Sequence, residues 1–406
     1  MPEEHPIRKK GTAHQQKRPS YSSTGAVFVL LSLVLLCFLA VVVHPDSHTS
    51  PDWTDAKAHT NLVGGLDVFS ANSRETAFDT ILSQHEEHSF IPEGALAAPV
   101  PDVLSFGETY RPRDIVEVIE DARDTGLLGK GETTVFSLAS VFPQDSPILY
   151  YFDSSLLAVS WQEIIDGHLC TFCEVRVSDA SQFRRKFSQD RFAASVKTTA
   201  SDLAVQANAV VAMNADNVLS HELGIAVYQR ELCRMNRWPY SVTKRCFNAV
   251  DTLLIDGSGN FRFSLSGTPW QKDDLERFLV EHNIVFSLVN GPALIIGGEA
   301  QELKAQPLGS LSASSTRAAI AQCASLHYLY CSVGDEAGFP GCTAKELTEI
   351  LLGKKVEHAY ALAGGQTAEL IFDGQVYSPL APKSERPVGD ILYFATALSD
   401  KGVARS

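Results

Sequence analysis

Positive charge is scarce in this 406-residue sequence. Lysine and arginine together number 34 against 48 aspartates and glutamates, a formal net charge of −14. Proteins that bind nucleic acid through its phosphates usually carry a basic face, so the composition argues against a nucleic-acid partner. Hydrophobic residues make up 45% of the chain and charged residues 20%. That apolar content is enough to bury a core and too high for a wholly disordered chain.

Common catalytic motifs are also absent. The sequence contains no P-loop, no G-x-S-x-G and no G-x-G-x-x-G, and His221-Glu222 lacks the second histidine of H-E-x-x-H. These absences exclude the most readily recognised nucleotide-binding, serine hydrolase and zinc protease sites. The cofactor, if the protein uses one, is left unknown.

The eight cysteines form no recognisable metal or redox framework. Cys170 and Cys173 have the C-x-x-C spacing of zinc and redox sites, but a second such pair is missing. They lie in the strand-like run LCTFCEVRV and not at a helix N-terminus, where a thiolate would be stabilised. Buried thiols or one or two disulfides fit this pattern better, and Cys233 and Cys246 are close enough in sequence to close a short loop. We expect no metal site.

The longest apolar run covers residues 25–43, GAVFVLLSLVLLCFLAVVV, and contains no charged residue. As a helix it would rise about 28 Å, close to the hydrocarbon thickness of a bilayer. Five basic and two acidic residues precede it. The positive-inside rule therefore predicts a single-pass membrane protein with a cytoplasmic N-terminus and an extracytoplasmic main domain. A cleaved signal peptide is the alternative, but the run is long for one and no clear cleavage site follows.

The chain divides into four predicted parts. Residues 1–24 are a basic cytoplasmic tail, 25–43 a transmembrane signal-anchor, and 44–144 a stalk or linker with short elements. Dense helix and strand patterning occupies residues 145–400. Helices and strands are interspersed there without strict βαβ alternation, which predicts an α+β domain with a mixed sheet core and packed helices.

The clearest predicted helix is 343–352, where Thr343 and Glu346 have the spacing of a capping box and Gly353 ends the apolar stripe. Ser178 is expected to cap another helix, one that carries Phe183 and Phe187 on one face. Further helices are expected at 114–124, 201–207 and 274–281. Strands are expected at 148–152, 156–159, 169–177, 209–213, 253–255, 326–333, 358–362, 369–372 and 390–395.

Three groups of residues at predicted strand ends are candidates for a site. Asn214 and Asp216 follow the apolar run ANAVVAM, Arg317 lies in STRAAIAQ, and GGQT at 364–367 separates two strands. Loops at strand ends commonly carry binding residues. Each group also has an ordinary structural explanation: an Asx-rich turn, a surface ion pair and a tight β-turn. The residues alone leave both interpretations open.

Taken in order, six segments between about residues 145 and 395 resemble the phosphodiester glycosidase family. They are NAVVAMNAD, DTLLIDGSGNF, FSLVNGPALIIGGE, STRAAIAQCASLHYLYCSV, the stretch from GCTAKELTEILL to GGQTAELIFDGQVYSP, and RPVGDILYF. No single segment is specific, but their shared order is. The resemblance implies hydrolysis of a sugar-1-phosphodiester at its glycosidic bond, with a glycan or sugar phosphodiester as ligand.

The resemblance also implies a set of site residues. Matched by position and neighbourhood, the catalytic residues are Asn214 and Asp216, and the substrate-binding residues are Arg317, Gly364, Gly365, Thr367 and Asp390.

Two polar positions of the family's glycine-loop motif are alanine here, Ala361 and Ala363. Neither side chain can ionise or form a hydrogen bond, and losing one member of a catalytic unit typically costs several orders of magnitude in rate. Two hypotheses follow. The domain is either a hydrolase with relocated carboxylates or an inactive glycan- or phosphodiester-binding envelope protein, and a purely structural ectodomain is a third, plainer option. The candidate carboxylates are Asp216, Asp335, Glu336 and Asp390.

Overall fold

The structure is a computed structural model, and all of the residues that it describes belong to Pro51–Ser406, one of two compact units of the chain. The described residues are 112–129, 131–143, 146–192, 196–216, 223–235, 246–248, 250–304, 309–334, 339–378 and 384–397. The predicted membrane segment 25–43 lies outside them, as do Asp335 and Glu336. Within these ranges, no helix is both long and apolar enough to cross a bilayer.

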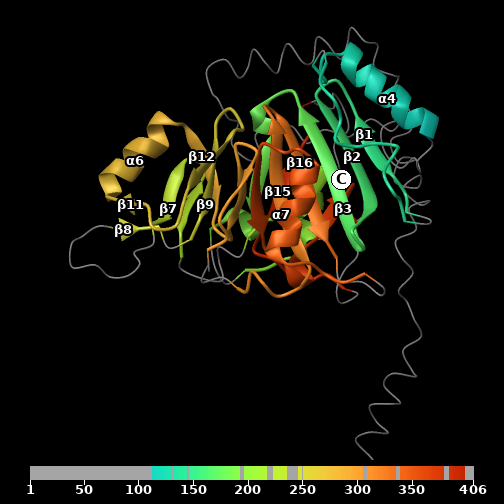
Figure 1. Ribbon diagram of the computed structural model, residues 1–406. Helices are drawn as coiled ribbons and strands as arrows, with labels where there is room; N and C mark the ends of the chain where they lie inside the picture. Colours follow the sequence, from blue (N-terminus) through green and yellow to red (C-terminus); the bar gives the residue numbers. More distant parts are fainter. Residues whose placement is uncertain are drawn as a thin grey trace, which may run out of the picture. The chain divides into compact units, whose positions relative to one another are not determined.

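Two large sheets dominate the described part of the chain (Figure 1). The eight-stranded sheet contains, in spatial order, β1 (Leu149–Phe152), β2 (Leu156–Ile165), β3 (His168–Val177), β16 (His327–Val333), β15 (Arg317–Ala324), β17 (His358–Leu362), β13 (Ala293–Ile296) and β14 (Glu299–Ala300). The five-stranded sheet contains β19 (Gln375–Val376), β18 (Leu370–Phe372), β5 (Val211–Asn214), β20 (Asp390–Phe394) and β4 (Phe183–Phe187).

Three smaller sheets contain the remaining strands of the described residues. One has the order β10 (Phe261–Ser264), β9 (Thr252–Asp256) and β12 (Ile284–Leu288). The others are the pairs β11 (Pro269–Trp270) with β8 (Cys246–Phe247), and β6 (Ile225–Tyr228) with β7 (Glu231–Met235).

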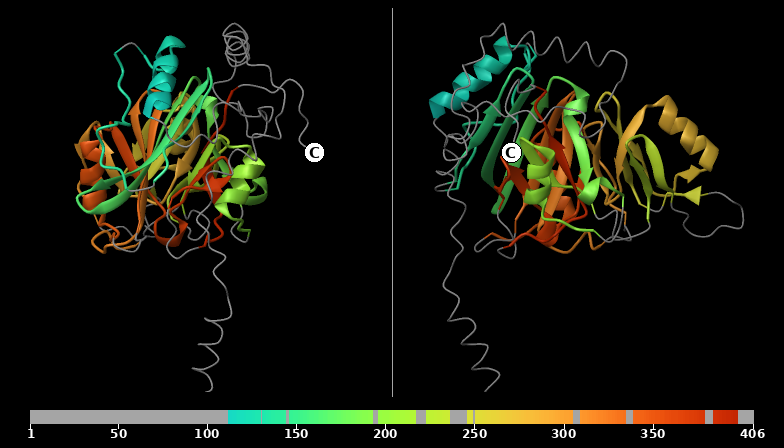
Figure 2. Two further views of the ribbon diagram at one scale, coloured as in Figure 1. Left: turned by 90° about the vertical axis from the view of Figure 1, so that its right-hand side faces the viewer. Right: turned by 180° about the vertical axis from the view of Figure 1, so that it is seen from behind.

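Four α-helices of the described residues cover these sheets: α4 (Pro112–Asp124), α5 (Ala200–Ala207), α6 (Lys272–Glu281) and α7 (Ala344–Gly353). Helices α4 and α7 pack in an apolar cluster on the outer face of the eight-stranded sheet, whereas α5 packs on the outer face of the five-stranded sheet. Accordingly, α7 lies toward the viewer in Figure 1, and α5 lies toward the viewer in the right-hand view of Figure 2, which is seen from the opposite side. The main core lies between the two sheets, with Phe183, Tyr328 and Phe394 among its rings.

The prediction of an α+β fold is confirmed. The sheets that we expected to be mixed contain only antiparallel pairs within the described residues. The helix at 343–352 is confirmed together with its capping box: Thr343 Oγ1 accepts from Glu346 N, and Glu346 accepts from Thr343 N at 2.7 Å.

The predicted helix after Ser178 is wrong. Asp179 caps a single 3₁₀ turn, and Phe183–Phe187 form strand β4 with all five residues buried. Two residues four apart lie on one face of a helix, but they also lie on one face of a strand. The spacing of Phe183 and Phe187 therefore fits both, and pairing of β4 with β20 decides between them.

Residues 112–143, which we placed in the stalk, pack against the domain. Ile115, Ala122, Leu128 and Phe136 belong to the apolar cluster on the outer face of the eight-stranded sheet. The Phe136 ring meets Trp161 edge-on at 5.3 Å. Removing apolar side chains from water is stabilising, so these contacts hold the segment against the eight-stranded sheet.

We expect Thr343→Ala to lower the free energy of unfolding by about 1 kcal/mol, because it leaves first-turn amide groups of α7 uncapped. Chemical denaturation of the full-length chain measures the change. Lys345→Ala is the control, since that side chain lies in the same turn and is 80% exposed. Equal effects of the two substitutions would contradict a stabilising role for the cap.

Candidate functional site

The residues that the sequence singled out lie at one end of the two large sheets. Asn214 ends β5, Asp390 begins β20 and Arg317 begins β15. The glycine loop at 364–367 follows β17. Gly365 N donates to Thr316 O, just before β15, and Ala363 N, just before the loop, donates to Ala215 O, just after β5. The topology thus brings these distant segments to the same end of the sheets. Their side chains occupy three different environments there.

The first environment is a buried ion cluster around Arg185. Its Nε donates to Asp390 Oδ2 and its Nη2 to Asp216 Oδ1, both at 2.7 Å. The three side chains are 1%, 1% and 0% exposed. Burial opposes the charge on Arg185, but the two carboxylates outweigh it and raise its pKa. In this arrangement Asp216 and Asp390 neutralise an internal cation and do not face solvent.

Asp216 also holds a wall of the neighbouring pocket. Its Oδ2 accepts from Val289 N at 2.5 Å. The next residue, Asn290, donates from Nδ2 to Leu362 O at 2.9 Å and lines the pocket. Asp216 is therefore connected to the pocket through the backbone of residues 289–290.

The second environment surrounds Asn214, which is 1% exposed. Its Nδ2 donates to Ala363 O at 2.6 Å, while its Oδ1 accepts from Glu369 N at 3.1 Å and from the Tyr330 hydroxyl at 3.2 Å. Both polar atoms of the amide are used inside the protein. Asn214 thus fixes the two ends of the glycine loop. For Asn214 and Asp216 the catalytic role stays a prediction.

The third environment is a pocket of about 260 Å³. Arg317, Gly364 and Gly365 line it together, and Ala361 lines it where the family motif has a polar residue. Asn290, Ser310, Ser315 and Thr316 supply further polar groups. None of the described lining residues is an aspartate, glutamate or histidine.

The glycine loop is shaped by steric limits. A Cβ at Gly364 would lie 2.5 Å from Thr316 O, and Gly365 has a φ of +66°. Glycine alone adopts both without strain. Thr367 donates from Oγ1 to Gly364 O at 3.0 Å and closes the turn. The loop can therefore approach a ligand closely through its backbone.

Among the described residues, Arg317 donates only to backbone carbonyls. Its Nε donates to Cys342 O at 2.9 Å, and Nη2 donates to Ser310 O at 2.8 Å and Ala313 O at 2.7 Å. No carboxylate of the described residues pairs with it. Burial lowers the pKa of Arg317, as expected for a cation that lacks an ionic partner. Among the described residues, it is the cationic group that this pocket offers to an anion.

Six cysteines in the described part of the chain are free thiols and form no disulfide. Cys170 and Cys173 are free thiols within β3, and burial raises the pKa of each to about 12. Cys233, Cys323, Cys331 and Cys342 are also free. No group of three histidines, cysteines or acids is placed to hold a metal ion in these ranges.

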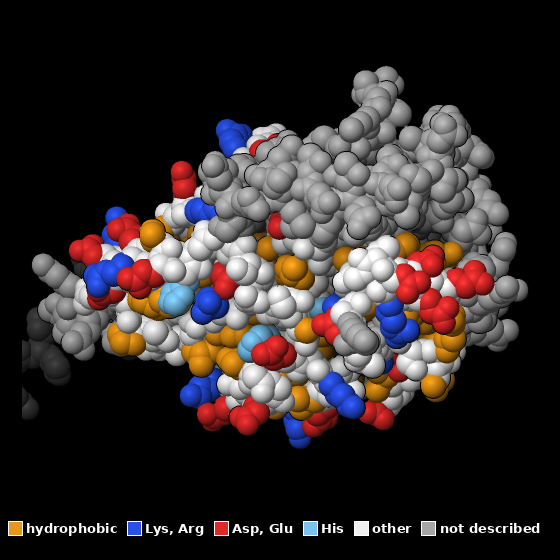
Figure 3. All heavy atoms as spheres, turned by 90° about the horizontal axis from the view of Figure 1, so that it is seen from above, with side chains coloured by type: hydrophobic (Ala, Val, Ile, Leu, Met, Phe, Trp, Pro, Cys, Tyr) orange, Lys and Arg blue, Asp and Glu red, His pale blue; other side chains and the backbone are white. Residues whose placement is uncertain are grey.

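The face shown in Figure 3 carries acidic and basic side chains interspersed around its edge, with hydrophobic side chains between them. The described residues of this face present no extended basic patch.

The sequence analysis missed one acidic residue at this end, Glu369. It is 0% exposed and directly precedes β18. Burial first, and then the neighbouring carboxylate of Glu385, raise the pKa of Glu369 to about 8. Glu385 is itself held by Ser201 N at 2.9 Å and Ser201 Oγ at 2.6 Å. The sequence did contain a signal for this residue, because Glu369 is a single acid directly before the fully apolar strand LIF at 370–372.

We expect Arg185→Met to destabilise the protein by about 3–5 kcal/mol, because it leaves two buried carboxylates without their cation. Arg277→Met is the matched control, since Arg277 is 64% exposed in its ion pair with Asp274 and exposed pairs contribute about 1 kcal/mol or less. Denaturant unfolding of both variants measures the difference, and similar losses would contradict the cluster's role.

The raised pKa of Glu369 predicts that the free energy of unfolding depends on pH. Its folded-state pKa is raised, so between about pH 4.5 and 8 the folded state keeps a proton that the unfolded state has released. The free energy of unfolding should therefore fall as pH rises through this interval. Glu369→Gln should flatten the profile, whereas Glu349→Gln, at a site 60% exposed, should not. An unchanged profile in Glu369→Gln would contradict the assignment.

Comparison with known proteins matches residues 200–395 to the phosphodiester glycosidase family. Solved structures similar to this chain include the catalytic domain of zebrafish N-acetylglucosamine-1-phosphodiester alpha-N-acetylglucosaminidase, auto-inhibited by its pro-peptide. It is 16% identical, with 63% of this chain and 86% of that chain covered and a TM-score of 0.46. A hypothetical protein from Synechocystis is 14% identical, with 62% and 64% covered and a TM-score of 0.44.

The comparison with curated proteins finds no match. Both TM-scores lie below 0.5, so the assignment depends on the family match. The resemblance seen in the sequence is confirmed over the matched residues: residues 200–395, a little under half of the chain, match the phosphodiester glycosidase family.

Proposed function

We propose that this domain binds a sugar-1-phosphodiester in the pocket around Arg317 and does not hydrolyse it. The observation that carries the proposal is the composition of the pocket. Its cation has no carboxylate partner among the described residues, and no described aspartate, glutamate or histidine lines it. A glycan that contains phosphodiester links, such as an envelope polymer, has the chemistry that this pocket would recognise.

The anion would lie against Arg317 and the glycine loop. Backbone carbonyls orient the guanidinium without cancelling its charge, so the charge is available to a phosphodiester oxygen. Backbone groups of Gly364 and Gly365 line the same pocket, where the lack of a side chain lets the sugar approach the chain.

Hydrolysis would need two carboxyl groups beside the anomeric carbon in the usual glycosidase mechanism. Asp216 and Asp390 are instead bound by Arg185, Glu369 is fully buried, and none of the three lines the pocket. Ala361, which does line it, supplies neither a charge nor a hydrogen bond. These placements support binding without turnover.

The proposal includes the predicted location. A signal-anchor at residues 25–43 would hold the domain at the outer surface of a membrane, with the basic residues 1–24 in the cytoplasm. The charge difference across the apolar run supports this orientation.

We expect the full-length chain to bind the methyl phosphodiester of N-acetylglucosamine 1-phosphate without releasing free sugar. Arg317→Gln should weaken binding by about ten- to a hundredfold, since it removes a charge-assisted contact, and Arg317→Lys should retain part of it. Calorimetry measures binding, and sugar release measures turnover. Circular dichroism confirms that each variant is folded, and Arg277→Gln controls for loss of a surface charge.

The double variant Ala361→Asn with Ala363→Asp tests the other half of the proposal. Sugar release by this variant but not by the native chain would support a binding site that has lost its chemistry. Sugar release by the native chain would overturn the proposal and favour the hydrolase with relocated carboxylates.

A further inference from the structure

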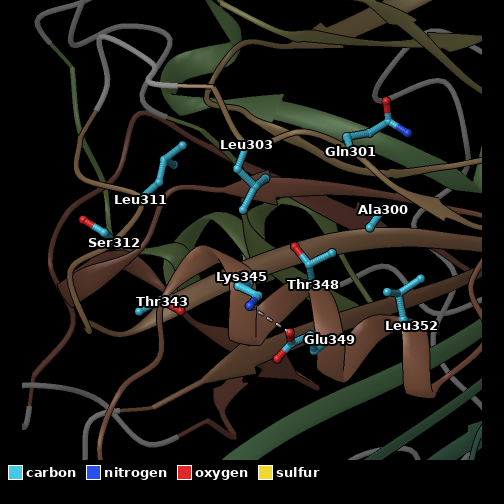
Figure 4. A pocket seen from close by; sticks show the side chains of 10 residues that line it. All are labelled: Ala300, Gln301, Leu303, Leu311, Ser312, Thr343, Lys345, Thr348, Glu349 and Leu352. Carbon is cyan, nitrogen blue, oxygen red and sulfur yellow. Dashed lines mark ion pairs between the residues drawn. The ribbon is translucent and has the colours of Figure 1, made fainter.

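A second, larger pocket of about 630 Å³ lies along helix α7 (Figure 4). Its walls include Leu303, Leu311 and Leu352, which come from three separate segments of the chain. Lys345 and Glu349, both on α7, pair with each other at 3.7 Å. The charges at this pocket are thus mutually compensated, and the surface offered to a ligand is largely aliphatic.

The larger pocket adjoins the pocket of Arg317. Leu311 lines both of them. The start of α7 divides between the two, since its N-cap Thr343 lines the larger pocket and its first residue Ala344 lines the smaller. The loop that carries Leu311 also supplies the Ser310 and Ala313 carbonyls that hold Arg317. One loop therefore separates a cationic pocket from an aliphatic one.

The sizes of the two pockets support a shared ligand. Pockets that bind small molecules usually measure about 300–1,000 Å³. The Arg317 pocket, at about 260 Å³, falls below this range, whereas its neighbour, at about 630 Å³, lies within it. A sugar phosphodiester with a substantial aglycone would need both.

We propose that the aglycone of the bound sugar-1-phosphodiester is an apolar chain, as in a lipid-linked sugar phosphate. The phosphodiester would lie at Arg317, and the apolar aglycone would pass Leu311 into the aliphatic pocket along α7. This inference rests on the proposed function and names the class of its ligand. Burial of methylene groups against leucine side chains would supply the selectivity, since apolar surface is removed from water.

The test compares two esters of N-acetylglucosamine 1-phosphate, the hexyl and the methyl phosphodiester. The full-length chain is held in lipid nanodiscs, and empty nanodiscs serve as the blank for partitioning. We expect the hexyl ester to bind about tenfold more tightly or better, because five more methylene groups are buried. Isothermal titration calorimetry measures both dissociation constants.

Two variants address the aliphatic pocket. Leu303→Glu places a charge in it, and Ala300→Trp fills it from an exposed strand without removing a core side chain. Each should bring the two esters to nearly equal affinity and leave methyl ester binding unchanged. Val280→Glu, on an α6 residue that is 80% exposed, is the control and should keep the preference.

The outcomes separate this inference from the proposed function. Binding of the methyl ester without a hexyl preference would overturn the inference and leave the proposed function intact. A hexyl preference that survives both Leu303→Glu and Ala300→Trp would mean that the hexyl group binds outside the aliphatic pocket. That result would also overturn the inference. Failure of both esters to bind would overturn the proposed function, and this inference with it.

Discussion

The buried guanidinium of Arg185 is the constraint on which the end of the domain that carries the candidate site depends. It joins β4 to Asp390 at the start of β20 and to Asp216 beyond the end of β5, and it also donates to the Ser287 carbonyl in β12. A cation removed from water needs such partners, because its desolvation is costly. Three strands and a connecting segment are thereby fixed to one another at the same end of the sheets.

The position of the pocket follows from that cluster. Asp216 fixes the backbone at Val289, and the adjoining Asn290 reaches across to Leu362. Asn214 secures the other side by binding both Ala363 and Glu369. The polar side chains at these strand ends are thus used to build the pocket, and Arg317 is left as its cation. This division of roles explains how the fold persists although two polar positions of the family motif are alanine.

Helix α7 borders both the polar pocket of Arg317 and the aliphatic pocket beside it. Its first turn is capped by Thr343 and Glu346, its buried face packs on the eight-stranded sheet, and its residues line both pockets. Both pockets are therefore built against the same helix. A ligand with a charged head and an aliphatic tail has the complementary pattern.

Local features of the sequence determined much of the fold. The capping box set the start of α7, and apolar runs located most of the central strands, because these signals act over a few residues. The pairing of β4 with β20 was decided only in the tertiary structure, since Phe183 and Phe187 fit a helix as well as a strand. The same holds for the environment of Asp216 and for the burial of Glu369. Arg185 and Asp390 are 205 residues apart in sequence, and no local pattern shows that a carboxylate will meet a buried cation instead of a substrate.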